Sequence, residues 1–318
     1  MSSPPAAFYC VTGRDFFPGA VALLNSLRLA GHDEPLFVLD AGMDPGQRAL
    51  LEPHATVVDA PLDAPPSMLK TIAPRAHPAG VMALLDADAV VTRPLGEQLE
   101  AAAGGRLAAF RNDKDRWFDE WGELLGLGEM RRGPYLTSSA LFMDRATAEG
   151  LLPLVAERQE RIDLDRTWVG AGSEADPLYF LDQDVINAVI RARLEPGWVA
   201  EYDARLAPIP PFSGLRLEDA AALRCRYEDG AEPFLLHHAS RKPWLVRMRA
   251  NVYSRLLTRL LLGDDVALRL DPGQLPLRLR DGGAATAARL ATDVGIGGPA
   301  FARRRLFPRR VRAWRDER

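Results

Sequence analysis

Apolar residues in this chain occur in two patterns: short continuous runs, and longer segments in which they recur every three or four positions. The segments that predict β-strands lie at 7–12, 36–39, 55–58, 81–85, 107–110, 140–143 and 235–238. The segments that predict helices lie at 20–30, 47–51, 95–103, 146–158, 185–190 and 246–262. The order strand, helix, strand, helix, strand near the N-terminus is typical of a parallel sheet with helical crossovers, so we expect an α/β fold.

The segment 81–85 is apolar at every position, which predicts a central strand buried on both faces. Asp86 and Asp88 follow it, and in extended backbone their carboxylates would lie on the same side and repel each other. A divalent cation with oxygen ligands would relieve that repulsion. The same spacing recurs at Asp113 and Asp115, Asp163 and Asp165, and Asp182 and Asp184. Only the Asp86 pair ends an apolar strand, where open α/β sheets bind ligands.

Composition limits the class of protein. Of 318 residues, 47% are hydrophobic and 26% charged, which is enough apolar content to bury a sizeable core. The net charge of -3 argues against a protein whose whole surface binds nucleic acid. Cys10 and Cys225 match no metal or redox spacing, which favours a reducing compartment. Because no signal peptide and no run of ~20 apolar residues is visible, we expect a cytoplasmic protein.

Val11 and Thr12 end the first predicted strand, and a strand–helix–strand opening usually binds a nucleotide at the carboxyl ends of its strands. The residues that follow, 13–15, form neither the glycine fingerprint of dinucleotide folds nor a Walker loop. Phosphates would therefore need another positive partner, and a metal ion at Asp86 and Asp88 would supply it.

Two more polar blocks lie beside predicted elements. The block 182–184 precedes a helix, and either of its aspartates would suit the cap of that helix. His237 and His238 end the last predicted strand, shortly before the tripeptide 242–244, Lys-Pro-Trp. Adjacent side chains of a strand point to opposite faces, so only one of the two histidines would reach a given cation.

Taken in order, four blocks resemble glycosyltransferase family 8, the retaining group that includes glycogenin and bacterial lipopolysaccharide galactosyl- and glucosyltransferases. They correspond to that family's metal-binding Asp-x-Asp, its Phe-Asn-Ser-Gly stretch, its Asp-Gln-Asp-x-x-Asn block and its His…Lys-Pro-Trp block. In this chain they read Leu84-Leu85-Asp86-Ala87-Asp88, Tyr135-Leu136-Thr137-Ser138-Ser139-Ala140, Phe180-Leu181-Asp182-Gln183-Asp184-Val185-Ile186-Asn187, and His237 to Trp244. Together they cover about residues 7 to 245.

The resemblance implies a GT-A-type fold, a Rossmann-like mixed sheet flanked by helices. The glycosyltransferase domain would comprise residues 1–245, followed at 246–318 by a helical and basic C-terminal extension. The implied activity is retaining transfer of a hexose, glucose or galactose, from a UDP-sugar to a glycan or lipid-linked acceptor. The implied cofactor is Mn²⁺ or Mg²⁺.

The resemblance also implies roles for individual residues. Metal ligands would be Asp86, Asp88 and His237, and catalytic residues would be Gln183 and Asp182. Substrate contacts would come from Val11, Thr12, Thr137, Ser138, Ser139, Lys242 and Trp244.

Two departures from the family pattern matter. Thr137 and Ser139 stand where the family usually has Asn and Gly, which would change contacts to the sugar or acceptor. The family normally has five residues between its histidine and lysine, whereas four separate His237 from Lys242. We assign the ligand to His237 because it directly follows the apolar strand residues, and a deletion is easily absorbed in the loop before Lys242.

Two alternatives belong to other classes. The Asp86 stretch also resembles the nucleophile motif of haloacid dehalogenase-type phosphatases, with Asp264 and Asp265 as that group's downstream acidic motif. Against it, three strands precede Asp86, whereas that group usually begins its core with the nucleophile strand. A non-catalytic sugar-nucleotide-binding protein would keep the metal site but lack acceptor chemistry.

The C-terminal segment 301–318 contains eight arginines among aromatic and aliphatic residues. This composition suits an anionic membrane surface, where each basic residue contributes roughly 1 kcal/mol. We expect peripheral contact with a membrane through this segment, without a span, at the inner face of the membrane.

Overall fold

A seven-stranded sheet forms the centre of the protein. The structure, a computed structural model, describes residues 3–61, 64–239, 241–280, 282–284, 286–288 and 290–292. The strand order is β3-β2-β1-β4-β7-β6-β8. The strands are β1 (Ala6–Thr12), β2 (Leu36–Asp40), β3 (Thr56–Asp59), β4 (Val81–Leu85), β6 (Leu107–Arg111), β7 (Leu136–Asp144) and β8 (Val199–Tyr202). The first four pair in parallel, as the sequence predicts, and β7 runs antiparallel to both β4 and β6.

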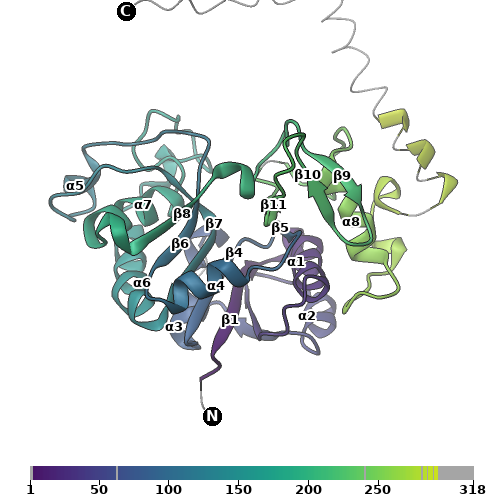
Figure 1. Cartoon of the computed structure of the whole chain (residues 1–318), viewed down its shortest axis with the longest axis horizontal. Helices are drawn as coiled ribbons and strands as arrows, with labels where there is room; N and C mark the ends of the chain where they lie inside the picture. Colours follow the sequence, from purple (N-terminus) through teal and green to yellow (C-terminus); the bar gives the residue numbers. More distant parts are fainter. Residues whose placement is uncertain are drawn as a thin grey trace, which may run out of the picture.

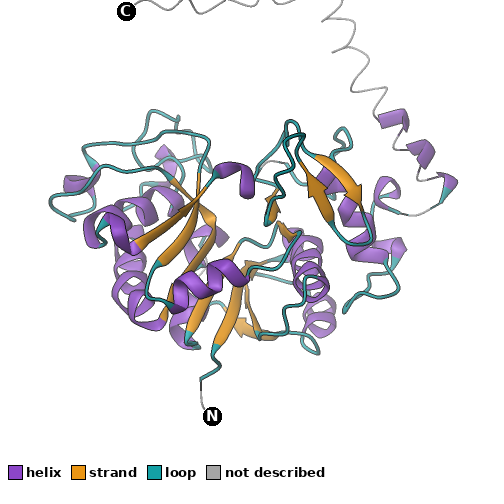
Figure 2. Cartoon of the chain, viewed as in Figure 1, coloured by secondary structure: helices purple, strands orange, loops and turns teal. Residues whose placement is uncertain are grey.

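Helices cover the sheet on both sides (Figure 2). They are α1 (Phe17–Leu29), α2 (Pro45–Leu51), α3 (Ile72–Ala76), α4 (Gly96–Ala103), α5 (Trp121–Leu124), α6 (Arg145–Gln159), α7 (Asp182–Arg193) and α8 (Val252–Leu262). Within the described part of the chain, none of them is long and apolar enough to cross a bilayer.

Alternation along the strands divides the interior into two cores. On β1, Phe8 and Cys10 face one core, whereas Ala7 and Tyr9 face the other. The first core is closed by apolar residues of α1, α4 and α8, and the second by those of α3, α6 and α7. Because successive side chains of a strand point to opposite faces, a strand covered by helices on both faces must be apolar throughout. The uniformly buried β4 fulfils this expectation.

Two small ribbons complete the fold, and one of them carries part of the candidate site. β5 (Ala89–Val91) pairs antiparallel with β11 (Leu235–His237), and β9 (Arg216–Asp219) pairs with β10 (Arg224–Arg226). Figure 1 shows β11 and β5 beside the carboxyl end of β4. The β5–β11 pairing therefore brings residue 237 next to the loop that follows β4.

The strands and helices predicted from the sequence are confirmed, but short elements were missed and one helix begins later than predicted. β5, β8, β9 and β10 were not predicted, because strands of three or four residues show too little alternation to be recognised. The helix predicted over 246–262 begins only at Val252, after a capping box formed by Asn251 and Ser254. Such a reciprocal pair satisfies the free N–H groups of the first turn and fixes where the helix starts.

The C-terminal helix α8 packs on α1 around one buried amide. Asn25, fully buried on α1, donates to the carbonyls of Leu260 and Leu268 at 2.7 Å each. It also accepts from the N–H of Leu268 at 2.9 Å. Leucines of α8 thus belong to the same core as β1 and β4. The domain division at 245/246 stays a prediction.

Candidate functional site

Asp86 and Asp88 lie in a tight turn between β4 and β5. The N–H of Asp86 donates to the carbonyl of Ser139 on β7, and the N–H of Ala89 donates back to the carbonyl of Asp86, both at 2.9 Å. The turn lies close to α1, since a Cβ added at Gly19 would be 2.7 Å from the carbonyl oxygen of Ala87. Only glycine permits this approach, and the backbone carrying both aspartates is held on two sides.

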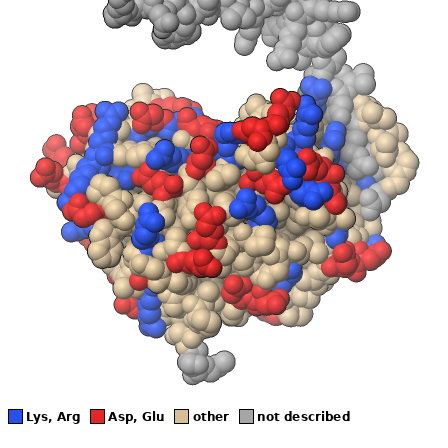
Figure 3. Space-filling view, in the orientation of Figure 1, with Lys and Arg blue, Asp and Glu red and all other residues tan. Residues whose placement is uncertain are grey.

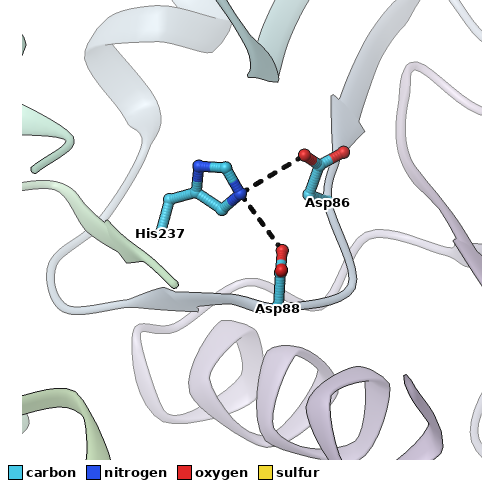
Figure 4. Close-up of side chains that lie close together, drawn as sticks. All are labelled: Asp86, Asp88 and His237. Carbon is cyan, nitrogen blue, oxygen red and sulfur yellow. Dashed lines mark ion pairs between the residues drawn. The ribbon is translucent and has the colours of Figure 1, made fainter. Parts of the chain in front are cut away.

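His237 reaches this turn from β11. The β5–β11 register pairs it with Ala89, so its ring lies over the aspartates. Its Nε2 is 3.4 Å from Oδ2 of Asp86 and 3.2 Å from Oδ1 of Asp88 (Figure 4). One ligand atom from each of the three residues lies within 4.8 Å of the others, and among the described residues no other such trio was found. These are oxygen and imidazole donors, which suit a divalent cation such as Mn²⁺.

Basic side chains hold Asp88 in its ionised form. The Nζ of Lys242 contacts Oδ2 of Asp88 and also donates to the carbonyl of His238. Burial alone would raise the pKa of Asp88, but His237 and Lys242 outweigh it and the pKa is lowered. A carboxylate with a lowered pKa stays charged at neutral pH and available to a cation.

Lys70 joins the cluster to α7 and was missed by sequence reasoning. Its Nζ lies 2.5 Å from Asp86, 2.8 Å from Asp182 and 3.2 Å from the hydroxyl of Ser138. Burial works to lower the pKa of this lysine, but the two aspartates outweigh it and the pKa is raised. Lys70 therefore carries a positive charge between the cluster of Asp86, Asp88 and His237 and the start of α7.

One signal in the sequence would have identified Lys70. Only three of the chain's 40 basic residues are lysines, namely Lys70, Lys114 and Lys242. Two of these three contact aspartates of the cluster, whereas Lys114 makes a surface ion pair with Glu174. The ammonium is a compact charge with three rotatable donors, and Lys70 directs them at Asp86, Asp182 and Ser138.

The first turn of α7 presents Asp182 and Gln183 to the same region. Leu181, just before it, has φ 50° and is fully buried, a left-handed conformation that is unfavourable for a non-glycine residue. Burial raises the pKa of Asp182, and the charge of Lys70 works against this. Gln183 accepts a hydrogen bond from the N–H of Ser138 through Oε1 at 3.1 Å.

Asp184 has a structural role instead. It is fully buried and bonded by Arg116 at 2.7 and 3.0 Å and by the hydroxyl of Tyr135 at 2.6 Å. It also accepts from the N–H of Phe180 at 2.8 Å. The two aspartates of this block thus differ, because Asp182 faces the cluster and Asp184 fastens the segment before α7.

On β7, the three polar residues face opposite ways. Ser138 meets Lys70, while the hydroxyls of Thr137 and Ser139 bond each other at 2.9 Å. Alternation along the strand accounts for this division. Ser138 is brought to the cluster, whereas the side chains of Thr137 and Ser139 bond each other and, among the described residues, none of the cluster's ionisable groups.

The other predicted substrate residues lie near the carboxyl end of β1. Val11 and Thr12 form the end of that strand and make no side-chain bond to the cluster. Trp244 donates from Nε1 to the carbonyl of Asp15 at 2.6 Å and packs against Gly19. This contact fixes the segment that carries Lys242 against the residues following β1.

The alternative metal ligand, His238, and the aspartates of the alternative phosphatase motif lie outside the cluster of Asp86, Asp88 and His237. His238 is fully buried, with its ring 4.9 Å from that of Tyr253, and burial lowers its pKa to about 4. Asp264 and Asp265, which a phosphatase of the dehalogenase type would need beside Asp86, are exposed and pair with Arg269 and Arg259. They take no part in the cluster.

Comparison with solved structures identifies the fold. The chain is similar to the galactosyltransferase LgtC in complex with donor and acceptor sugar analogs, with a TM-score of 0.55, 14% identity, and coverage of 85% of this chain and 100% of LgtC. An active-site mutant of LgtC matches with a TM-score of 0.56 at 15% identity, with the same coverage. The bifunctional glycosyltransferase WbbM, in its apo structure, matches with a TM-score of 0.53 at 16% identity, over 84% of this chain and 50% of WbbM.

The chain has a GT-A-type fold. This confirms the expected Rossmann-like mixed sheet flanked by helices. Comparison of the sequence with protein families and with curated proteins gives no match. At these identities the likeness concerns the fold, so the activity has to be argued from the site.

The different roles of the two aspartates in the 182–184 block give a stability prediction. Asp184→Asn leaves the guanidinium of Arg116, only 7% exposed, without its counter-ion, and should lower the free energy of unfolding by about 3 kcal/mol. Asp182→Asn is the matched control and should lower it by less than about 1 kcal/mol, because Lys70 keeps its pairing with Asp86. Urea denaturation measures both, and equal losses would contradict the division of roles.

Proposed function

We propose that this protein is a metal-dependent retaining glycosyltransferase that moves a hexose, glucose or galactose, from a UDP-sugar to a glycan or lipid-linked acceptor. The observation that carries the proposal is the cluster of Asp86, Asp88 and His237 directly after the central strand β4. Its position in a GT-A-type fold, together with the donor and acceptor sugar analogs bound by LgtC, supports a sugar nucleotide as the ligand.

Mn²⁺ or Mg²⁺ is the cofactor that this activity requires. Asp86, Asp88 and His237 would hold it, and their oxygen and imidazole donors fit such a cation. When bound, the cation acts as a Lewis acid that offsets the charge developing on the leaving diphosphate. The donor set is already oriented, since Nε2 of His237 faces both carboxylates.

Lys242 is proposed to bind the donor's diphosphate beside the metal ligands. Its ammonium is buried next to Asp88, where a point charge acts more strongly than in water. Trp244 braces this segment against residues 15–19. Val11 and Thr12, at the end of β1, are proposed to contact the nucleoside, the usual ligand position at the carboxyl ends of parallel strands.

Lys70, Asp182 and Ser138 are proposed to bind the hexose. They combine a cation, an anion and a hydroxyl within hydrogen-bonding distance of one another, which is the set of partners that sugar hydroxyls need. Thr137 and Ser139 flank Ser138 on β7 with their hydroxyls bonded to each other, so they are proposed to contribute to substrate binding through the backbone of the strand. Asp182 would stabilise the positive charge that develops at the anomeric carbon.

Retention of configuration is proposed from the resemblance of the block 182–184 to a retaining family, and the character of Gln183 supports one route to it. Its Oε1 accepts a hydrogen bond from the N–H of Ser138, and an amide is a poor nucleophile. Departure of the diphosphate and attack by the acceptor on the same face of the sugar therefore fit better than a stable covalent intermediate.

The protein is proposed to work in the cytoplasm, with peripheral contact at the inner face of the membrane. The eight arginines of 301–318 support this contact by their composition. That segment lies outside the described residues.

The activity itself gives the first test. Incubation with UDP-glucose or UDP-galactose, Mn²⁺ and a mixture of glycan acceptors should yield an α-linked product, identified by NMR of the anomeric proton. A β-linked product from the α-linked donor would contradict retention. Binding of the UDP-sugar without turnover would instead favour a non-catalytic binding protein, and release of phosphate from a generic phosphatase substrate would favour the phosphatase.

Lys70 and Lys114 form a matched pair for testing the proposed hexose site. Lys70→Met removes the cation between Asp86 and Asp182 and should lower kcat roughly 100-fold at saturating metal, as expected for loss of one oriented donor. Lys114→Met removes a surface ion pair with Glu174 and a contact of the ammonium with the ring of Phe180, and should leave kcat unchanged. Similar kcat values for both variants would exclude Lys70 from the site.

The choice between the two histidines is tested by direct metal binding. His237→Ala should weaken Mn²⁺ binding at least ~100-fold, because even outer partners of metal ligands contribute about 10- to 100-fold. His238→Ala, which loses packing against Tyr253, should weaken it less than about tenfold. Electron paramagnetic resonance of free Mn²⁺ measures both constants, with circular dichroism as the folding control. The reverse order would make His238 the ligand.

A further inference from the structure

The chain between Glu232 and Asp264 contains basic residues and no acidic one. Figure 3 shows acidic and basic side chains intermixed on the face that it presents, so this stretch departs from the general surface. Lys242 and Arg259 are paired with aspartates. The remaining basic residues are exposed and make no ion pair within the described ranges: Arg241, Arg247, Arg249 and Arg255.

α8 divides this stretch into a buried face and a polar face. Its leucines pack against α1, which Figure 1 shows beside it. Its opposite face carries a stripe at helical spacing, formed by Ser254, Arg255, Thr258 and Arg259. This stripe lines a groove of about 580 Å³ together with residues of the segment 243–250 and with Arg278, Leu279, Thr286, Leu290 and Thr292.

The groove concentrates positive charge. Among the residues that the structure describes, no acidic side chain lines it. Nη1 of Arg259 is buried there with no hydrogen-bond partner among the described residues. Arg278, a third lining arginine, donates to the carbonyls of Pro243 and Val246, and burial and the neighbouring Arg247 lower its pKa. Arginine forks beside serine and threonine hydroxyls match the oxygens of a phosphate group.

Exposed leucines surround the same arginines. Leu245 is 52% exposed, Leu277 47% and Leu290 61%. Large apolar side chains beside cationic ones are typical of surfaces that lie at a lipid interface, with leucine in the acyl boundary and arginine at the headgroups. Nucleic acid would instead favour exposed aromatic rings, and Trp244, within this stretch, is buried.

We propose that the arginine face, defined as Leu245, Arg247, Arg249, Arg255 and the groove beside α8, docks on an anionic phospholipid surface. The groove receives the phosphate of one headgroup, and the leucines enter the interface around it. This docking surface belongs to the folded part of the chain and is separate from the segment 301–318. It does not depend on the proposed transferase activity.

Co-sedimentation of the full chain with vesicles tests the proposal. The protein should partition onto phosphatidylcholine mixed with an equal amount of phosphatidylglycerol, and not onto phosphatidylcholine alone. The triple variant Arg247→Gln, Arg249→Gln and Arg255→Gln should partition about 100-fold less, since each basic residue near an anionic surface contributes about fivefold. Unchanged partition of this variant would overturn the proposal.

A matched control removes the same charge elsewhere. Three exposed arginines outside the arginine face, which likewise have no ion pair among the described residues, are replaced in Arg75→Gln, Arg161→Gln and Arg193→Gln. This variant should partition within about threefold of the parent chain, because its charges lie away from the docking face. If this variant lost as much vesicle binding as the first, net charge alone would explain the binding, and the proposal would be overturned.

Two further measurements distinguish a lipid headgroup from a soluble phosphate and from nucleic acid as the anion that the arginine face binds. Inorganic phosphate should release the protein from vesicles no better than chloride at equal ionic strength, and stronger release would mean that the groove takes a soluble phosphate instead. Binding of a single-stranded oligonucleotide that is lost in the first triple variant would assign the face to nucleic acid and overturn the lipid assignment. An unchanged Tm of both triple variants shows that the fold is retained.

Discussion

The constraint on which the candidate site depends is the repulsion between two carboxylates held together at the end of a buried strand. Unit charges no more than 4.8 Å apart in a protein environment of effective dielectric about 20 repel by roughly 3.5 kcal/mol or more. The structure offsets this with two lysines, Lys70 and Lys242, and places the imidazole of His237 beside both carboxylates. Lys70 comes from the segment before β4, whereas His237 and Lys242 come from β11 and the loop after it, so the local electrostatics require distant parts of the chain to fold together.

The mixed character of the sheet follows from the same requirement. β7 enters antiparallel beside β4, and this places Ser138 and the backbone of Ser139 against the Asp86 turn. The β5–β11 ribbon then returns the chain over that turn with His237 on its inner side. A parallel β7 would need a helical crossover, and its start, with Ser138 and Ser139, would lie at the opposite edge of the sheet from the Asp86 turn.

The fold and the acidic part of the site were predictable because they are local. The uninterrupted apolar run of β4 and the two aspartates after it are visible in nine consecutive residues, 81–89. Lys70 was not predictable by spacing, since it approaches Asp86 and Asp182 only through the packing of a short helical turn on β1. The short strands β8 to β10 were missed for a related reason, because their existence depends on pairing partners far along the chain.

The four Asp-x-Asp pairs show how context decides the chemistry of one spacing. Asp115 pairs weakly with Arg132 at 3.7 Å on the surface, and Asp163 bonds the N–H of Asp165 in an exposed turn. Asp184 is buried and fully used by Arg116 and its neighbours. Only the pair after β4, with Asp88 buried and Asp86 partly buried, has oxygens that face a common imidazole, and carboxylates removed from water in this way need a cation beside them. The burial of the preceding strand, more than the motif itself, therefore makes this pair a candidate metal site.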